Sequence, residues 1–299
     1  MKRALQVLFA PGESRDTSKA QGQAGDRIFS FATITTYLED GVRMVRWCQE
    51  TYGVRELSEI TPAMVTEYVA HLVDAEVSGG YLGRVKAAIR KLDRGTRALG
   101  WQKRMAPEWL PAGGGWHSDA RPERAYTLEQ AEQLIAALAD AGDPQIALVA
   151  RLQCVAGLRV GEAAMVRGQD IDVAAGIVQV RRGSKGGRPR DVTIDPQHRE
   201  FLQRLQQRAA GHRDGCVFQG RGDRGASLIQ RTQTAVATAC QALGIPCYGT
   251  HGFRKTYAQA RYAEEFAAGA TDRTAREQLT QELGHNRIAV TYSYVPQPE

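Results

Sequence analysis

Apolar residues recur at helical spacing along most of this chain. In the first half, Tyr37, Val42, Val45 and Cys48 follow that period from Thr33 onward. A second helix is predicted to begin at Thr61-Pro62, because threonine is a good N-cap and proline suits the first turn. A third is predicted from Tyr81 to about Leu99, after the Gly79-Gly80 break. These segments predict a small helical bundle over residues 28–105.

The second half is also mostly helical, with one β element. Thr127 and Gln130 have the spacing of a capping box, and the stretch DPQIALVARLQCVAG predicts a strongly apolar helix. GIVQVRRGSKGGRPRDVTID has β-branched flanks around a glycine-rich basic centre, which predicts a β-hairpin. After Pro196 the helical period returns. The expected fold class is therefore mainly α with a small β-hairpin (α+β).

Proline and glycine positions divide the chain into domains. Residues 1–27 show no sustained period and are expected to form a flexible tail. The segment PEWLPAGGGWHSDARPERAY predicts a linker over about 106–122, because it combines three prolines with three consecutive glycines. The second domain is then expected to cover residues 123–299.

Charge and cysteine usage narrow the class of protein. The net charge is +6 and the pI is about 9.1, which suits a polyanionic partner. Five cysteines without a C-x-x-C pair predict neither a disulfide framework nor a zinc site. We expect a cytoplasmic protein, because the N-terminus lacks the pattern of a signal peptide and no apolar run reaches the length of a membrane span.

The predicted third helix carries almost only positive charge, with Asp93 as the one opposing residue. A solvated face normally mixes both signs, so this crowding favours contact with a phosphate backbone. The basic hairpin suggests the same for its own residues. The candidate DNA-binding residues are Arg84, Lys86, Arg90, Lys91, Arg94, Arg97, Arg181, Arg182 and Arg188.

Candidate catalytic residues are weak signals when each is taken alone. Arg159 with Glu162 three residues later fits an ordinary helical ion pair. Lys185 at a hairpin tip fits solubility alone. His251 and Arg254 share a helix face, but one such pair is no surprise by chance. His285 fits a C-capping role, and either Tyr292 or Tyr294 could simply pack.

In order and spacing, these residues resemble the tyrosine recombinase (phage integrase) family. AGLRVGEA is similar to the family's first arginine box, and RRGSKGGRPRDVTI to its lysine-bearing hairpin. HGFRKTYA is similar to the His-x-x-Arg box, and LGHNRIAVTYSY to the final His-to-Tyr segment. The resemblance covers the second domain, and the preceding bundle fits the family's core-binding domain in position and kind.

The resemblance implies a role for each residue. Tyr294 is the implied nucleophile, because the family's interval from the last histidine to the tyrosine is nine residues; Tyr292 is left to pack. Arg159 and Arg254 would neutralise the phosphate oxygens, and Lys185 would protonate the departing 5′-oxygen. His251 would assist proton transfer, and His285 would hydrogen-bond the phosphate. Glu162 would hold the geometry from behind the site.

The implied function is site-specific recombination of double-stranded DNA through a 3′-phosphotyrosyl intermediate, by a homotetramer on two DNA sites. The residues show no metal-ligand cluster and no phosphate-binding loop, so neither a metal nor ATP is expected.

Two alternatives stay open: a type IB topoisomerase-like relaxing enzyme, and a catalytically silent DNA-binding accessory protein. The residues do not distinguish integration of a mobile element from excision or resolution. Only VPQPE follows Tyr294, so the way in which subunits couple is left open.

Overall fold

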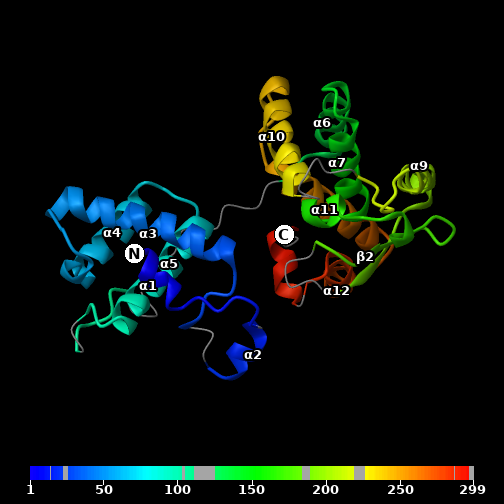
Figure 1. Cartoon of the computed structure of the whole chain (residues 1–299). Coiled ribbons are helices and arrows are strands. Elements are labelled where there is room, and N and C mark those ends of the chain that lie inside the picture. Colours follow the sequence, from blue (N-terminus) through cyan, green and yellow to red (C-terminus); the bar gives the residue numbers. More distant parts are fainter. Residues whose placement is uncertain are drawn as a thin grey trace. The chain divides into compact units, whose positions relative to one another are not determined.

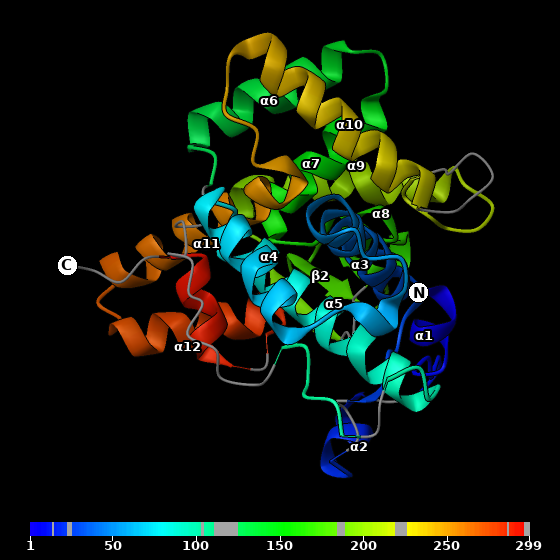
Figure 2. The same cartoon turned by 90° about the vertical axis from the view of Figure 1, so that its left-hand side faces the viewer.

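The chain divides into two compact units, Met1–Arg121 and Pro122–Glu299. The computed structural model describes residues 1–13, 15–22, 26–102, 105–110, 125–183, 189–218, 226–285 and 287–295. The first unit is helical, and the second combines helices with one small sheet (Figures 1 and 2). Each unit has its own apolar core. The predicted fold class is confirmed.

Three long helices form most of the first unit: α3 (Phe31–Tyr52), α4 (Pro62–Asp74) and α5 (Gly79–Ala98). As predicted, the Thr61 side chain caps α4 and Pro62 occupies its first turn. The start of α5 differs from the prediction, because Ser78 accepts a hydrogen bond from the Tyr81 amide. Gly79 and Gly80 therefore lie inside the first turn instead of before it. The shorter elements are α1 (Lys2–Gln6), α2 (Arg15–Ala20) and η2 (Leu57–Glu59).

The prediction of a flexible tail over residues 1–27 is wrong for its first ten residues. Ala4 and Leu5 on α1 are fully buried against the bundle. The amide of Ile28 donates to the Leu8 carbonyl at 2.8 Å, and the Ala10 amide donates to the Ile28 carbonyl at 2.8 Å. Burial of these apolar side chains outweighs the entropy of ordering a chain end. The segment is too short to show a clear period, which is why the sequence pattern missed it.

The predicted linker over 106–122 is also partly built into the first unit. Trp109 and Leu110 are buried in its core. The Trp109 amide donates to the Asp93 carboxylate at 3.2 Å. Arg97 donates to the carbonyls of Ala106 and Pro107 at 2.7 and 2.6 Å. These contacts fix residues 106–110 on the end of α5, and residues 111–122 lie outside the described part.

The described ranges of the second unit contain seven helices beside the sheet. The long ones are α6 (Leu128–Asp140), α7 (Pro144–Ala156), α9 (Arg199–Ala210), α10 (Ala226–Leu243), α11 (Gly249–Ala267) and α12 (Asp272–Leu283), and α8 (Val160–Ala164) is short. The same ranges contain three 3₁₀ segments: η3 (Gly168–Asp170), η4 (Pro196–His198) and η5 (Ile288–Ser293). Helices α6 and α10 lie side by side in both views (Figures 1 and 2). The predicted Thr127–Gln130 capping box is present.

The predicted hairpin is confirmed as β2 (Ile177–Val180) paired with β3 (Arg190–Thr193) in antiparallel register. Val178 and Val192 face each other and are fully buried, so this face of the hairpin belongs to the core. A third strand, β1 (Ile171–Asp172), pairs with the edge of β2 that lies opposite β3. Two residues are too few for an alternating pattern, so the sequence did not predict β1.

Helix α11 joins the main core to the end of the chain. It packs against α7 on one side and α12 on another. A small apolar cluster of Tyr257, Leu279, Leu283, Tyr294 and Val295 fixes the residues after η5 on these helices. Within the described ranges, no helix combines the length and apolar character that a membrane span requires.

The packing of α1 can be tested with two glycines of α5. A Cβ on Gly95 would lie 1.7 Å from the Ala4 carbonyl oxygen, whereas a Cβ on Gly83 would meet nothing within 4 Å. We expect Gly95→Ala to displace α1 and expose residues 1–10 to protease. Gly83→Ala should stabilise the bundle by about 0.5–1 kcal/mol, because alanine loses less backbone entropy in a helix. Limited proteolysis and urea unfolding of the full chain measure both effects. Equal behaviour of the two variants would contradict the packing.

Candidate active site

Arg159 lies at the start of α8, where the chain turns after α7. Gly157 ends α7 in the left-handed region at φ 59°, and Arg159 is the N-cap of α8. Its backbone amide and its guanidinium both donate to the Glu162 carboxylate, at 2.9 and 2.8 Å. The Glu162 side chain is fully buried, while about a third of the Arg159 side chain is exposed. Glu162 therefore fixes Arg159 from behind and leaves part of the guanidinium accessible.

Two further arginines reach the same carboxylate. Arg190, at the start of β3, donates to both Glu162 oxygens at 3.1 and 2.7 Å. Arg254 on α11 lies 3.6 Å from Glu162. Three guanidiniums thus surround one carboxylate, and the excess positive charge favours an incoming anion.

Arg254 is held with almost no freedom. Its side chain is fully buried, and it donates to the carbonyls of Gly157 and Leu283, each at 2.6 Å. Burial lowers the pKa of Arg254 to about 10, so the group stays charged at neutral pH. Its Nε has no hydrogen-bond partner in the described part of the chain. A buried charged donor in this state suits a bound oxyanion.

His285 follows the glycine that ends α12, and its Nε2 lies 3.3 Å from Arg254. Burial, with the charges of Arg254, Arg159 and Arg190, lowers the pKa of His285 to about 4. The ring is therefore neutral at pH 7. A guanidinium can only donate, so Nε2 accepts and the ring proton is on Nδ1. Gly284 is the C-cap of α12, so the C-capping role considered for His285 falls to the glycine before it.

Tyr294 and Tyr292 lie in different environments. Tyr294 is buried, and its hydroxyl lies 3.1 Å from His251 Nε2. Its ring contacts the rings of His251 and His285, with centroids 5.4 and 5.3 Å apart. Tyr292 is 41% exposed and lies over the Arg276 guanidinium at 4.0 Å. The segment is a 3₁₀ helix instead of an α-helix, but residues two apart still point to different sides.

The backbone around Tyr294 is anchored, which the sequence did not suggest. The Gln259 side chain donates to the Tyr294 carbonyl, and buried Arg276 donates to the Val295 carbonyl, both at 3.0 Å. Arg276 also contacts Asp272 at 2.7 Å. These contacts, all within one chain, hold the tyrosine hydroxyl at His251.

The structure describes only two of the three hairpin residues predicted to bind DNA. Arg181 pairs with Asp191 at 3.1 Å, and Arg182 pairs with Asp170 at 2.7 Å. Lys185 and Arg188 lie outside the described residues. Contact between this hairpin and DNA stays a prediction.

Asp93 is the one acidic residue of α5, as the sequence shows, but it is not the helix's only counter-charge among the described residues. Arg84 pairs with the buried carboxylate of Asp40 at 2.8 Å, and Arg94 pairs with Asp26 at 2.8 Å. Further partners of the helix are Asp93 for Arg97, the Arg27 carbonyl for Lys91 and the Leu110 carbonyl for Arg90. Acidic residues distant in sequence thus relieve much of the repulsion. DNA contact by these residues and by Lys86 stays a prediction, but crowding of positive charge no longer supports it.

Tyr126 supports the site although no sequence signal marked it. Its hydroxyl accepts from the Tyr248 amide and donates to the Gly249 carbonyl, each at 3.0 Å. These bonds cap the start of α11, two residues before His251. The partners lie more than 120 residues away along the chain, beyond the reach of any local pattern.

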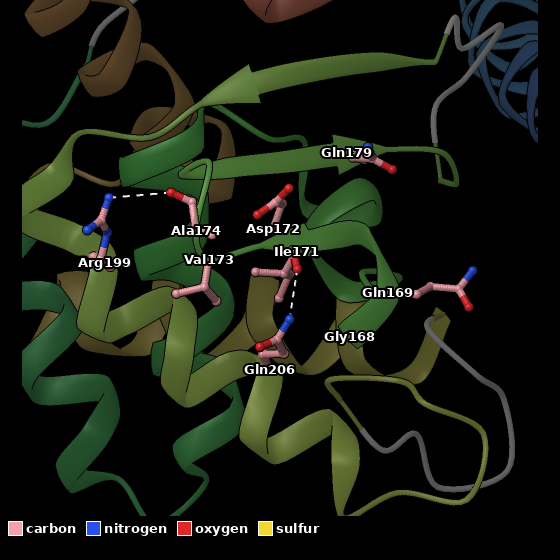
Figure 3. A pocket seen from close by; sticks show the side chains of 9 residues that line it. All are labelled: Gly168, Gln169, Ile171, Asp172, Val173, Ala174, Gln179, Arg199 and Gln206. Atoms are coloured by element: carbon pink, nitrogen blue, oxygen red, sulfur yellow. Dashed lines mark hydrogen bonds between the residues drawn. The ribbon is translucent and has the colours of Figure 1, made fainter.

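A separate shallow pocket of about 680 Å³ lies where β1 and the turn after it meet α9 (Figure 3). Two of its polar side chains already bind the protein: Gln206 donates to the Ile171 carbonyl and Arg199 to the Ala174 carbonyl. Among the described residues, none of those predicted to be catalytic lines it. Across the described ranges, no group of three or more His, Cys, Asp or Glu side chains is placed to bind a metal.

Known proteins resemble this chain in sequence. The family model described as "Phage integrase family" matches residues 124–298. Tyrosine recombinase XerC of Pseudomonas putida (strain W619) is 26% identical over 277 residues, which cover 90% of this chain and 86% of that protein.

Two solved structures share the fold at lower identity. A lambda integrase(75-356) dimer bound to a COC' core site has a TM-score of 0.62 and 16% identity, covering 93% of both chains. The XerH site-specific recombinase bound to palindromic difH substrate has a TM-score of 0.62 and 16% identity, covering 96% of this chain and 82% of that one.

The low pKa of His285 predicts a dependence of stability on pH. Between pH 6.5 and about 4 the unfolded ring binds a proton that the folded ring does not. The contribution of His285 to stability is therefore complete above pH 6.5 and is lost as the pH falls towards 4. We expect the wild type to lose more unfolding free energy over this interval than His285→Gln, which cannot titrate. Urea unfolding at both pH values measures the difference, and equal losses would refute the neutral state.

Proposed function

Because this chain belongs to the phage integrase family, we propose that it is a tyrosine-type site-specific recombinase acting on double-stranded DNA. The observation that carries this proposal is the position of the Tyr294 hydroxyl, 3.1 Å from His251 Nε2 and beside Arg254 and His285. A phenol, a proton acceptor and fixed guanidiniums are what transfer of a phosphodiester to tyrosine requires.

In the proposed reaction, the Tyr294 oxygen attacks a DNA phosphorus and the bond to the 5′-oxygen breaks. His251 Nε2 takes the phenol proton, for which its distance is suitable. The products are a 3′-phosphotyrosyl diester and a free 5′-hydroxyl. Because one phosphodiester replaces another, a second 5′-hydroxyl can reverse the step without ATP.

Negative charge grows on the non-bridging oxygens as the tyrosine attacks. Arg159 and Arg254 are assigned to these oxygens, and guanidinium suits the task because it stays charged and can bind two oxygens at once. Neutral His285 is assigned a hydrogen bond to the phosphate. It donates this bond from Nδ1, or its ring exchanges the contact with Arg254 for one with the phosphate. Lys185 is assigned to protonate the 5′-oxygen, as the family resemblance implies.

Exchange between two duplexes requires four strand cleavages, and each Tyr294 supplies one. We therefore propose that four copies assemble on two DNA sites. The lambda integrase in the comparison is a dimer on one core site, which supports two subunits per site in that protein.

The decisive experiment is covalent capture of DNA. A duplex that becomes covalently linked to the wild type is first selected from a random pool. The same duplex is then prepared with a nick next to the cleaved phosphate, and the nick traps the adduct. We expect an adduct with the wild type and none with Tyr294→Phe. Tyr292→Phe should cleave within about twofold of the wild type, because a phenyl ring retains the cation–π contact with Arg276.

Two outcomes would replace the proposal. If no adduct forms with any duplex that the protein binds, the chain is a DNA-binding accessory protein. If a monomer relaxes supercoiled plasmid without site preference, it is a relaxing enzyme of the type IB kind.

Cleavage should also be independent of divalent metal. The arginines and the lysine supply the positive charge that metal ions supply in other phosphoryl-transfer sites. We expect the rate of adduct formation in excess EDTA to equal that in magnesium at matched ionic strength. Loss of activity in EDTA and its return with magnesium would contradict the mechanism.

A further inference from the structure

The side chain of Arg190 is 8% exposed and joins three parts of the second unit. It starts strand β3, and its two terminal nitrogens bind the two oxygens of Glu162 on α8. Its Nε donates to the Glu282 carbonyl at 2.7 Å, close to the end of α12. A Cβ on Gly284 would lie 2.9 Å from an Arg190 nitrogen, so the guanidinium passes directly over the turn that leads to His285.

The other end of the same hairpin is fixed on α8 as well. Gly183 has φ +75°, and a Cβ on it would lie 2.2 Å from the Gly161 carbonyl oxygen and 2.8 Å from the Glu162 amide. Only a glycine permits this approach. The backbone of Gly183 thus packs against Gly161, while Arg190 binds the next residue, Glu162.

These two anchors flank the segment 184–188, which contains Lys185 and lies outside the described residues. Both anchors are on consecutive residues of the helix that Arg159 begins. The points at which the lysine segment leaves and rejoins the fold are therefore fixed relative to Arg159.

We propose that Arg190 is a positioning residue for the departing 5′-oxygen: it fixes the lysine hairpin on the helix that carries the phosphate-binding arginine. The inference rests on the proposed role of Lys185. Arginine is required because a lysine has no planar fork that binds two carboxylate oxygens and a carbonyl together. A purely stabilising ion pair would instead affect all steps of the reaction alike.

A substrate with sulfur in place of the bridging 5′-oxygen separates these possibilities, because a thiolate leaves without being protonated. Arg190→Lys retains the positive charge beside Glu162, and Glu162 retains its two bonds to Arg159. On the ordinary nicked duplex we expect this variant to cleave about a hundredfold more slowly than the wild type, as a displaced catalytic group would cause. On the sulfur duplex its rate should be within about threefold of the wild type.

The matched control is Arg151→Lys, on α7 and outside the candidate site. Arg151 is partly exposed and, like Arg190, binds both oxygens of a glutamate, here Glu132 at 3.1 and 2.5 Å. It should cleave both substrates within about twofold of the wild type. Gly183→Ala disturbs the second anchor and should show the same selective defect as Arg190→Lys.

Lys185→Ala distinguishes failure of this inference from failure of the proposed function. If Lys185→Ala is rescued by sulfur but Arg190→Lys is equally slow on both substrates, Arg190 does not act through the lysine and the inference is wrong. If Arg190→Lys cleaves the ordinary duplex at the wild-type rate, the inference is also wrong. If Lys185→Ala is not rescued, the role assigned to Lys185 falls, and the inference falls with it.

Discussion

The catalytic unit depends on one buried carboxylate, Glu162, bound by arginines from different parts of the chain. Arg159 comes from α8, Arg190 from β3 and Arg254 from α11. Removing one partner of such a buried group leaves uncompensated charge and typically costs about 3–5 kcal/mol. Glu162 therefore fixes the relative positions of segments that lie almost a hundred residues apart.

Burying this cluster of charges costs free energy, and the same burial favours binding of a polyanion. Arg254 has no exposed surface, its Nε has no partner in the described part of the chain, and His285 beside it is kept neutral. A neutral histidine adds a hydrogen bond without adding repulsion between like charges. Tyr294 is meanwhile held by its backbone, so its hydroxyl meets His251 without the need to order a loose chain end. Binding of a phosphate would compensate the excess positive charge.

Prediction from sequence succeeded where an element is long and its pattern regular. The long helices and the β2–β3 hairpin follow from spacing, and the capping box at Thr127 marks its helix start correctly. It failed where burial overrides local signals. Helix α1 and Trp109 pack into the first core from segments that were expected to be a tail and a linker. The charge on α5 was misjudged because Asp26 and Asp40, distant in sequence, supply its counter-charges.

The sequence alone indicated which side chains to expect at the candidate site, because the order and spacing of its motifs resemble those of the phage integrase family. It also distinguished Tyr294 from Tyr292 by an interval. Only the tertiary structure decided what holds these residues together: the ion pairs of Glu162, the cap of Tyr126 on α11 and the anchor of Arg190. Apart from the local Arg159–Glu162 pair, these contacts join residues from 28 to more than 120 positions apart. No local pattern encodes them, since they depend on which buried groups meet when the cores pack.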